Sequence, residues 1–313
     1  MRIIYYNVQD LSDHGAPYLQ VIQQLIPTAQ MRKWQAGDDG PADYALVWKP
    51  PVQMLAGRTD LKAIFTLGAG VDAIMGLSDQ IPAHVPIIRM EDAGMAEQMA
   101  DYVSYALLRY FRHFGHYEEA ARKAVWQPLA TGNTKSAFPV AILGLGILGT
   151  VIAQRIQQLN FPVLGWSRTQ KNLEGAACYF GADGLKNCLS KAQVVVCVLP
   201  LTADTTGILN RSTLSNMPKG AYLINVARGA HVVEADLVAL LRSGQLAGAT
   251  LDVVQTEPLP PLHPLWQQPN LTITPHIAAV TVHEQGNTQV AEKLVRLEQG
   301  LPVTGVINRR LGY

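Results

Sequence analysis

Three residues in the C-terminal half of the chain, Arg228, Glu257 and His276, have side chains that could act together on an organic acid. A guanidinium is a permanent planar cation whose donors match the two oxygens of a carboxylate. An imidazole transfers protons near neutral pH, and a neighbouring carboxylate orients it and favours its charged form. The three side chains therefore indicate the reduction of a 2-oxo acid, a reaction that also needs a hydride donor.

A glycine-rich turn at residues 144–149 predicts where that donor binds. An apolar strand pattern at 138–143 ends in Gly-x-Gly-x-x-Gly, a helical pattern follows at 151–159, and a second strand pattern follows at 161–166. In such βαβ units the glycines form a tight turn, admit the pyrophosphate and let helix and strand pack closely, with the phosphates at the helix N-terminus. We expect the following residues to contact a dinucleotide: Gly144, Gly146, Ile147, Leu148 and Gly149.

The residues after the second strand predict NADPH rather than NADH. An NAD site usually has an acidic residue about 20 positions past the glycines, but this chain has Ser167, Arg168, Thr169 and Lys171 there. Arg168 could pair with a 2′-phosphate, and the hydroxyls of Ser167 and Thr169 could donate hydrogen bonds to it. The alternative is a solvated loop end that is basic by chance.

Each of the three reactive residues also has a structural interpretation. His276 could be a buried histidine bonded to a backbone carbonyl, Arg228 could bridge two domains, and Glu257, which precedes a proline, could begin a turn. Because a nucleotide-binding unit lies in the same chain, we expect one active site that contains all three residues rather than three unrelated structural roles.

Composition agrees with two α/β domains. At 313 residues, with 48% hydrophobic and 16% charged residues, the chain is long and apolar enough for two cores. Its net charge of +1 gives no electrostatic footprint for nucleic acid or an acidic membrane surface. Cys178, Cys188 and Cys197 form neither a disulfide framework nor a zinc pattern. We expect a cytoplasmic protein, because no apolar run reaches the length of a signal peptide or of a membrane span.

Strand and helix patterns alternate along the whole chain. The first hundred residues contain strand patterns at 2–6, 44–48, 61–66 and 86–89, then a helix from Met95 to about Val125 and a loop at 127–135. Near-continuous apolar strands at 193–200, 221–225, 249–253 and 271–274 predict a parallel sheet covered on both faces. The three reactive residues follow strand ends, where open α/β sheets bind ligands. His113 and His116 have helical spacing, but no further ligands complete a metal site, so we expect no metal.

The turn at 144–149 and the segments around Arg228, Glu257 and His276 resemble the D-isomer-specific 2-hydroxyacid dehydrogenases over nearly the whole chain. More narrowly, residues 44–51, 67–72, 94–99 and 166–169 resemble bacterial reductases of that family that use NADPH to reduce glyoxylate and hydroxypyruvate. The resemblance implies two Rossmann-like, doubly wound domains with a cleft between them, and a homodimer. It divides the chain into a substrate domain, 1–101 plus 283–313, and a central NADP-binding domain, 102–282.

Further site residues follow mainly from this resemblance. It places Leu199, Pro200, Ala227 and Asp252 against the cofactor, with Asp252 bonded to the nicotinamide amide. Backbone N–H groups of the glycine-rich segment Gly68, Ala69 and Gly70 could bind the substrate carboxylate, although such turns are also common without function. Trp48 could close a small pocket or could simply be a core aromatic. Val254, and the segment 278–281, depart from the usual family residues beside the nicotinamide.

The expected reaction is NADPH-dependent reduction of glyoxylate to glycolate and of hydroxypyruvate to D-glycerate. His276 would give a proton to the developing alkoxide, Glu257 would hold the imidazole, and Arg228 would bind the substrate's carboxylate and carbonyl oxygen. Two alternatives stay open: a cofactor-sensing protein like the C-terminal-binding-protein corepressors, and a dehydrogenase for another D-2-hydroxy acid. A phosphoglycerate dehydrogenase is disfavoured, because a regulatory domain is not expected after Tyr313.

Overall fold

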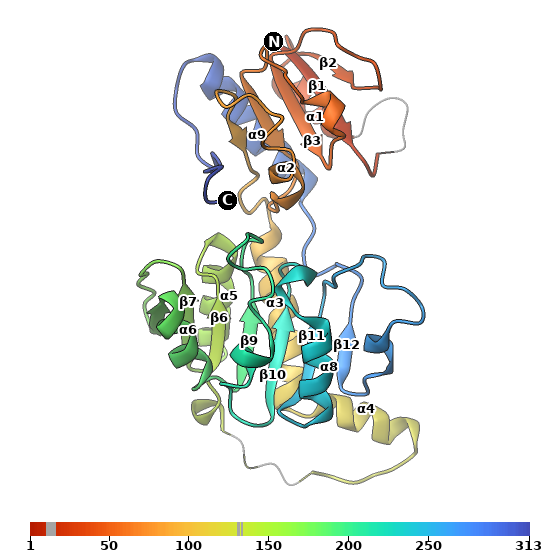
Figure 1. Ribbon diagram of the computed structural model, residues 1–313, viewed down its shortest axis with the longest axis vertical. Helices are drawn as coiled ribbons and strands as arrows, with labels where there is room; N and C mark the ends of the chain where they lie inside the picture. The colour runs from red at the N-terminus through yellow and green to blue at the C-terminus, as the bar shows by residue number, and fades with distance from the viewer. Residues whose placement is uncertain (11–16, 130–131, 133) are drawn as a thin grey trace. The chain divides into compact units, whose positions relative to one another are not determined.

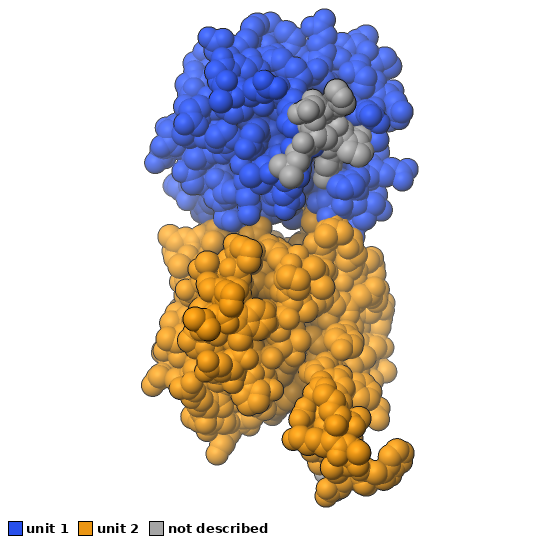
Figure 2. Space-filling model, turned by 90° about the vertical axis from the view of Figure 1, so that its right-hand side faces the viewer, with its two compact units in different colours: residues 1–94, 281–313 blue, residues 95–280 orange. Residues whose placement is uncertain are grey.

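The computed structural model describes residues 1–10, 17–129, 132 and 134–313. The chain forms two compact units: unit 1 comprises residues 1–94 and 281–313, and unit 2 comprises residues 95–280 (Figure 2). Part of the loop expected at 127–135, namely residues 130, 131 and 133, lies outside the described residues.

Unit 1 is built on a five-stranded sheet in the order β2-β1-β3-β4-β5, with every neighbouring pair parallel (Figure 1). Its strands are β1 (Arg2–Asn7), β2 (Gln30–Lys33), β3 (Tyr44–Trp48), β4 (Ala63–Thr66) and β5 (Ile87–Ile88). Its helices are α1 (Pro17–Leu25), the 3-10 turn η1 (Val52–Met54), α2 (Asp72–Met75) and α9 (His283–Glu298). Because α9 packs against α1, the two ends of the chain belong to one unit.

Unit 2 is built on a seven-stranded parallel sheet in the order β12-β11-β10-β9-β6-β7-β8, the arrangement of dinucleotide-binding sheets with one added strand. Its strands are β6 (Val140–Leu143), β7 (Val163–Ser167), β8 (Ala176–Phe180), β9 (Val194–Cys197), β10 (Ala221–Asn225), β11 (Leu246–Leu251) and β12 (Leu271–Ile273). Its helices are α3 (Met95–Phe111), α4 (Phe114–Arg122), α5 (Ile147–Gln158), α6 (Gly181–Leu189), α7 (Arg211–Leu214) and α8 (Glu234–Arg242). Short 3-10 turns are η2 (Lys135–Ala137), η3 (Gly229–His231) and η4 (Pro264–Gln267).

The central strands of unit 2 bury side chains on both faces. On one face Leu143 and Val195 pack with apolar residues of α6, α7 and α8. On the other face Ile142 and Val196 pack with apolar residues of α3 and α5. Alternate residues therefore enter two separate cores, which is why these strands read as continuous apolar runs. The predicted α/β fold with two doubly wound parallel sheets is confirmed.

The expected single helix from Met95 to about Val125 is wrong. The chain leaves α3 after Phe111, and His113 takes a left-handed conformation with φ of 57° before α4 begins. Whereas α3 buries seven residues, α4 buries none, so no core packing holds the two segments on one axis. The helix α4 projects from the body of unit 2 (Figure 1).

Two strands at sheet edges, β2 and β8, were not predicted. Both pair with a single neighbour, and their residues are only partly buried. An edge strand has no reason to be continuously apolar, and β2, with the sequence Gln-Met-Arg-Lys, lacks the pattern that marks the central strands. The sequence of β8, Ala-Ala-Cys-Tyr-Phe, does carry an apolar run and could have been recognised.

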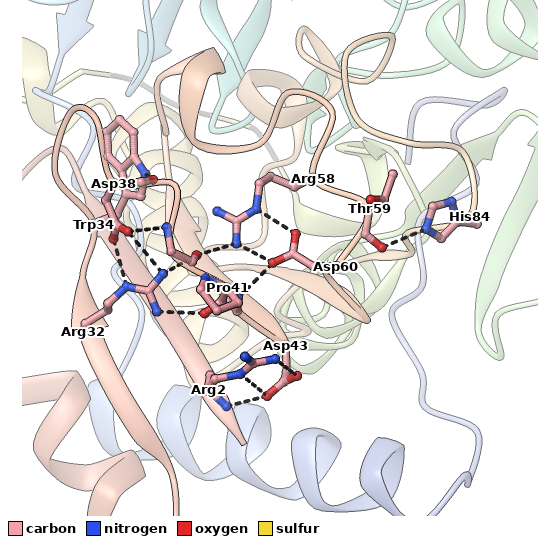
Figure 3. A network of polar contacts seen from close by, with 12 residues as sticks. Arg2, Arg32, Trp34, Asp38, Pro41, Asp43, Arg58, Thr59, Asp60 and His84 are labelled. Atoms are coloured by element: carbon pink, nitrogen blue, oxygen red, sulfur yellow. Dashed lines mark hydrogen bonds and ion pairs between the residues drawn. The ribbon is translucent and has the colours of Figure 1, made fainter.

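A polar network holds the loops of unit 1 near the amino ends of its strands (Figure 3). It contains three arginine–aspartate pairs: Arg2–Asp43, Arg32–Asp38 and Arg58–Asp60. Asp60 also accepts a hydrogen bond from the backbone N–H of Ala42, at 2.9 Å. The Arg58 guanidinium holds the pKa of the Asp60 carboxyl well below its usual range. Arg2, Asp43 and Asp60 precede β1, β3 and β4 or begin them, and Arg32 and Asp38 tie β2 to the loop that follows it, so we interpret the network as structural.

The cysteines carry no reactive thiolate in the buried part of unit 2. Burial raises the pKa of the Cys188 and Cys197 thiols to about 12, so both stay protonated. In the portion of the chain that the structure describes, no group of three His, Cys, Asp or Glu side chains could hold a metal ion. None of the described helices is long and apolar enough to cross a membrane.

Candidate active site

The glycine turn between β6 and α5 has the geometry of a dinucleotide-binding loop. Gly144 has a left-handed φ of 108°, and a Cβ there would lie 2.8 Å from the carbonyl oxygen of Val198. A Cβ on Gly149 would lie 1.8 Å from the carbonyl oxygen of Gly144, so only glycine permits this contact of helix and turn. At Gly146 the space around the Cβ position is open to 4 Å. The turn is therefore closed on its protein side and open where a pyrophosphate would approach the backbone.

This turn lies where the strand order of unit 2 reverses. β6 has β7 on one side and β9 on the other, so the segments after β6 and β9 diverge to opposite faces of the sheet. Leu199 and Pro200 follow β9 and border the turn, because the Leu199 backbone nitrogen lies 3.3 Å from the Cβ position of Gly144. Open α/β sheets bind nucleotides at this switch point.

The end of β7 presents a cationic loop. Arg168, Thr169 and Lys171 are exposed, whereas Ser167 is buried and its hydroxyl donates to the backbone carbonyl of Thr169 at 2.7 Å. That bond folds the loop back on itself and leaves the longer side chains accessible. No acidic residue occurs between Ser167 and Lys171, so nothing in this segment repels a 2′-phosphate. These residues fit NADPH.

Arg228 follows β10 in a loop that buried side chains hold from two sides. The Asn225 side chain donates through Nδ2 to the Arg228 carbonyl at 2.9 Å and accepts through Oδ1 from the N–H of Ala227 at 3.1 Å. The buried His231 accepts from the N–H of Arg228 at its Nδ1 atom, at 3.2 Å. The Arg228 guanidinium itself donates through Nη1 to the carbonyl of Ala227 at 2.7 Å. The backbone of Arg228 is thus fixed before any substrate binds.

His276 and Glu257 lie in direct contact. The Nδ1 atom of His276 is 2.9 Å from Oε2 of Glu257, and both side chains remain about 40% exposed (43% and 39%). Because a carboxylate accepts, Nδ1 carries the hydrogen and Nε2 is the nitrogen left to face a ligand. The other carboxylate oxygen of Glu257 accepts from the N–H of Val254 at 3.4 Å. The structure therefore brings together two of the three residues that the sequence indicated.

The sheet places Arg228 on the same edge as this pair. Asn225 of β10 is in register with Leu251 of β11, which is in register with Ile273 of β12. Arg228 and His276 each lie three positions beyond the registered residue of their own strand. Parallel neighbours are about 4.8 Å apart, so roughly 10 Å separates the two strand ends. A long guanidinium side chain covers much of such a distance.

Asp252, expected to contact the nicotinamide amide, is 2% exposed and already holds the loop that carries His276. Its Oδ1 accepts from Ile277 N and from the Thr274 hydroxyl, and its Oδ2 accepts from Ala278 N, at 2.6–2.9 Å. A carboxylate offers about four acceptor positions, so one position remains for a ligand N–H. The cofactor role stays a prediction.

The expected substrate residues Trp48, Gly68, Ala69 and Gly70 lie in unit 1, at the carboxyl ends of β3 and β4. The Trp48 ring covers Gly68 closely, since a Cβ on Gly68 would be 2.5 Å from Trp48 Cζ3. Gly68 is buried, and its carbonyl accepts from the Thr66 hydroxyl at 3.0 Å. Trp48 and the glycine segment thus form one local group within unit 1.

Several residues with a part in this site were missed in the sequence. They are Asn225 and His231 beside Arg228, and Thr274 and Tyr102 behind His276. Asn225 and Thr274 stand at strand ends and could have been noticed there. Tyr102 could not, because it lies in a helix 172 positions from the threonine that it contacts.

The fold and this arrangement define a hydroxyacid dehydrogenase. A family model described as "D-isomer specific 2-hydroxyacid dehydrogenase, NAD binding domain" matches residues 104–278, and the chain belongs to this family. The predicted resemblance is confirmed. Glyoxylate/hydroxypyruvate reductase A of Serratia proteamaculans is 45% identical over 317 residues, covering 100% of both chains.

Solved structures agree with the family assignment. A D-isomer specific 2-hydroxyacid dehydrogenase from Xanthobacter autotrophicus Py2, in complex with NADPH and MES, is 39% identical with a TM-score of 0.92, covering 100% of this chain and 99% of that one. An NADPH-dependent glyoxylate/hydroxypyruvate reductase from Sinorhizobium meliloti, in complex with NADP and sulfate, is 32% identical with a TM-score of 0.89 and the same coverage.

Proposed function

We propose that this chain is an NADPH-dependent reductase of small 2-oxo acids that converts glyoxylate to glycolate and hydroxypyruvate to D-glycerate. The observation that carries the chemistry is the 2.9 Å hydrogen bond between His276 and Glu257 at the carboxyl edge of a dinucleotide-binding sheet. The full-length similarity to proteins named as glyoxylate/hydroxypyruvate reductases supports the choice of substrates.

Each of the three residues has a separate task in this proposal. His276 donates the proton at Nε2 to the carbonyl oxygen of the substrate as that oxygen becomes an alkoxide. Glu257 holds the imidazole through Nδ1 and stabilises its positive charge. Arg228 binds the carboxylate and the carbonyl oxygen, which orients C2 and stabilises negative charge in the transition state. Bound NADPH supplies the hydride that adds to C2.

The turn of unit 2 and the end of β7 bind the cofactor in this proposal. Gly146, Ile147 and Leu148 at the start of α5 face the pyrophosphate through their backbone. The side chains of Arg168 and Lys171 compensate the charge of the 2′-phosphate, and the Thr169 hydroxyl bonds to it. The Ser167 hydroxyl bonds to it only by exchanging its bond to the Thr169 carbonyl for one to the phosphate. The remaining contacts are assigned to Gly144, Gly149, Leu199, Pro200, Ala227 and Asp252. Solved relatives with bound NADPH or NADP support the preference for the phosphorylated cofactor.

We assign cofactor binding to unit 2 and substrate binding in part to unit 1. The family model that names an NAD-binding domain covers residues 104–278, all within unit 2. In unit 1, the backbone N–H groups at Gly68, Ala69 and Gly70 bind the substrate carboxylate, and the Trp48 ring limits the size of the substrate.

The proposal includes a cytoplasmic homodimer. Helix α4 buries none of its residues, and the Trp126 side chain beyond it is 101% exposed, with Val125 beside it 49% exposed. Aromatic side chains of this size are costly in water and are enriched where proteins meet. Light scattering of the purified protein, compared with Trp126→Ser, measures the assembly, and a monomeric wild type contradicts it.

The first experiment follows NADPH absorbance with glyoxylate, hydroxypyruvate and pyruvate in parallel, and repeats each assay with NADH. Rapid oxidation of NADPH by the first two acids supports the proposed function. Tight binding of NADPH without turnover of any 2-oxo acid contradicts it and favours a cofactor-sensing protein.

A further inference from the structure

The loop that carries His276 has little packing to hold its shape. It follows β12, an edge strand of three residues that pairs only with β11, and the strand's residues are only partly buried. Pro275, His276 and Ile277 are exposed. His276 also has a φ of 57°, a left-handed conformation that is unfavourable for a residue with a Cβ. Ala278 enters the core beside α3 and α5, but residues 275–277 have no such packing, so hydrogen bonds must fix the part of the loop around His276.

One buried carboxylate supplies most of those bonds. Asp252 Oδ1 accepts from Ile277 N at 2.8 Å, and Oδ2 accepts from Ala278 N at 2.9 Å. The backbone carbonyl of Asp252 accepts from His276 N at 2.9 Å, and the same N–H also donates to the Thr274 carbonyl at 3.0 Å. Three consecutive amides of the loop thus bond to Asp252, one to its backbone carbonyl and two to its carboxylate, so a rotation of the carboxylate would release the amides of Ile277 and Ala278, which follow His276 directly.

Two hydroxyl groups continue the chain of bonds from Asp252 to α3. The Thr274 hydroxyl lies 2.6 Å from Asp252 Oδ1, and the Tyr102 hydroxyl lies 2.5 Å from Thr274 Oγ1. Asp252 acts as an acceptor toward every partner, so Thr274 must donate to it. The single hydrogen of Thr274 is then used, and Tyr102 must be the donor to Thr274. Burial raises the pKa of Tyr102 to about 12, so the phenol keeps the hydrogen that this direction requires.

The same face of α3 holds the other end of the loop. Gln98 lies four residues before Tyr102, and positions four apart share a helix face. Its side chain donates to the Val280 carbonyl at 2.8 Å and lies 3.3 Å from the Val280 N–H, which donates to it. Residues 274–280 are therefore attached to α3 at both ends, and α3 itself is anchored by seven buried side chains.

We propose that Thr274 and Tyr102 are positioning residues of the active site: they fix Asp252, and Asp252 fixes the loop so that His276 directs Nε2 at the substrate. The inference rests on the proposed function, in which His276 donates the proton. Neither hydroxyl touches the substrate. A small shift of a reacting group is enough to matter, because a misplacement of about 1 Å can cost roughly 10²-fold in rate.

Thr274→Val tests this series of hydrogen bonds directly, since valine keeps the shape of threonine and removes the hydroxyl. We expect kcat with glyoxylate to fall about 10-fold, in the range set by loss of alignment, and KM for NADPH to change less than kcat does, because Asp252 is only one of the assigned cofactor contacts. Thr274→Ser retains the hydroxyl and should restore kcat to within about threefold of the wild type. Tyr102→Phe should lower kcat about threefold, because Asp252 keeps its threonine donor.

Two matched control variants remove a threonine hydroxyl and a tyrosine hydroxyl that lie near the loop but do not bond to it. Thr272→Val changes a threonine of β12 whose hydroxyl accepts from Arg109 at 3.4 Å. Tyr110→Phe changes a tyrosine of α3 that donates to the carbonyl of Gly220 at 2.5 Å. Both controls should leave kcat within about twofold of the wild type, since neither hydroxyl bonds to the loop.

Amide hydrogen exchange measures how firmly the loop is held and does not require catalytic activity. In Thr274→Val, exchange at Ile277 and Ala278 should accelerate about tenfold, while exchange in β10 stays as in the wild type. Unchanged exchange at these two amides, equal losses of kcat in Thr272→Val, or acceleration throughout the sheet would each overturn the proposal. A wild type with no turnover refutes the proposed function, whereas the exchange data still decide whether the hydroxyls hold the loop.

Discussion

Replacing Gly229 with alanine should displace Arg228 from the loop containing Glu257. A Cβ on Gly229 would lie 1.9 Å from the carbonyl carbon of Val254 and 2.0 Å from its oxygen. Ordinary contact begins at 3.4 Å, so the two backbone segments must separate by 3.4 − 1.9 = 1.5 Å. Neither atom is the flexible end of a side chain. The shift acts on the residue after Arg228 and on Val254, whose N–H bonds to Glu257.

A separation of this size predicts a fall in kcat/KM for glyoxylate of about 10²-fold, equivalent to about 2.7 kcal/mol. Inserting a methyl group into a packed position also costs roughly 1–3 kcal/mol of stability, so thermal unfolding is measured in parallel. The assay is steady-state oxidation of NADPH, together with NADPH binding followed by fluorescence. NADPH binding should fall less than kcat/KM, because most of the assigned cofactor contacts lie in the glycine turn at 144–149 and after β7, and only Ala227 and Asp252 lie beside the displaced segments.

Gly184→Ala is the matched control in the same unit. A Cβ at Gly184, within α6, would meet its nearest atom at 3.4 Å, and alanine is a better helix former than glycine. This variant should keep both activity and stability. A Gly229→Ala protein with kcat/KM within about threefold of the wild type would show that the loops are not held against each other, and our reasoning about Arg228 would be wrong.

Other expectations can be tested with single substitutions. Arg168→Asp should raise KM for NADPH at least about 10-fold and leave KM for NADH nearly unchanged, because it removes a charge-assisted bond to the 2′-phosphate; an unchanged NADPH/NADH ratio contradicts the assignment. His276→Ala should lower kcat by about 10²- to 10⁴-fold, and a variant keeping half of its turnover rate excludes His276 as the proton donor. In unit 1, Arg58 lowers the pKa of the Asp60 carboxyl in the folded protein. The ion pair therefore stabilises the folded state fully above the usual carboxyl pKa, and this stabilisation is lost as the pH falls below about 4. Asp60→Asn should therefore lower the free energy of unfolding at pH 7 by about 1 kcal/mol, a value discounted for partial exposure. In this variant the free energy of unfolding should also depend less on pH below about 4 than in the wild type. Equal acid sensitivity in both proteins refutes this.

The sequence predicted those parts of the fold that packing makes regular. The central strands of unit 2 are buried on both faces, so their apolar runs were visible, and the glycine turn stood between a strand and a helix as its mechanism requires. The break after Phe111 was not visible, because helical spacing continues in the sequence where no core exists to hold the helix.

The candidate site divides in the same way. Residue type and position at strand ends were enough to select His276 and Glu257, which the structure brings to 2.9 Å across 19 positions. The residues that support them depend on long-range geometry: Tyr102 contacts Thr274 from helix α3, and Asp252 binds a loop that begins more than 20 positions later. Such contacts leave no local pattern in a single sequence.

Unit 1 is made of two segments that are far apart in the sequence, and this affects the order of folding during synthesis. Unit 2 is one continuous segment and is complete once residue 280 has been made. Unit 1 lacks α9 until the last residues emerge, yet α9 packs on α1, and Glu298 accepts a hydrogen bond from the Tyr44 hydroxyl at 2.8 Å. During synthesis, residues 95–280 can therefore fold while residues 1–94 still lack α9, so the N-terminal segment is the part most dependent on protection from aggregation.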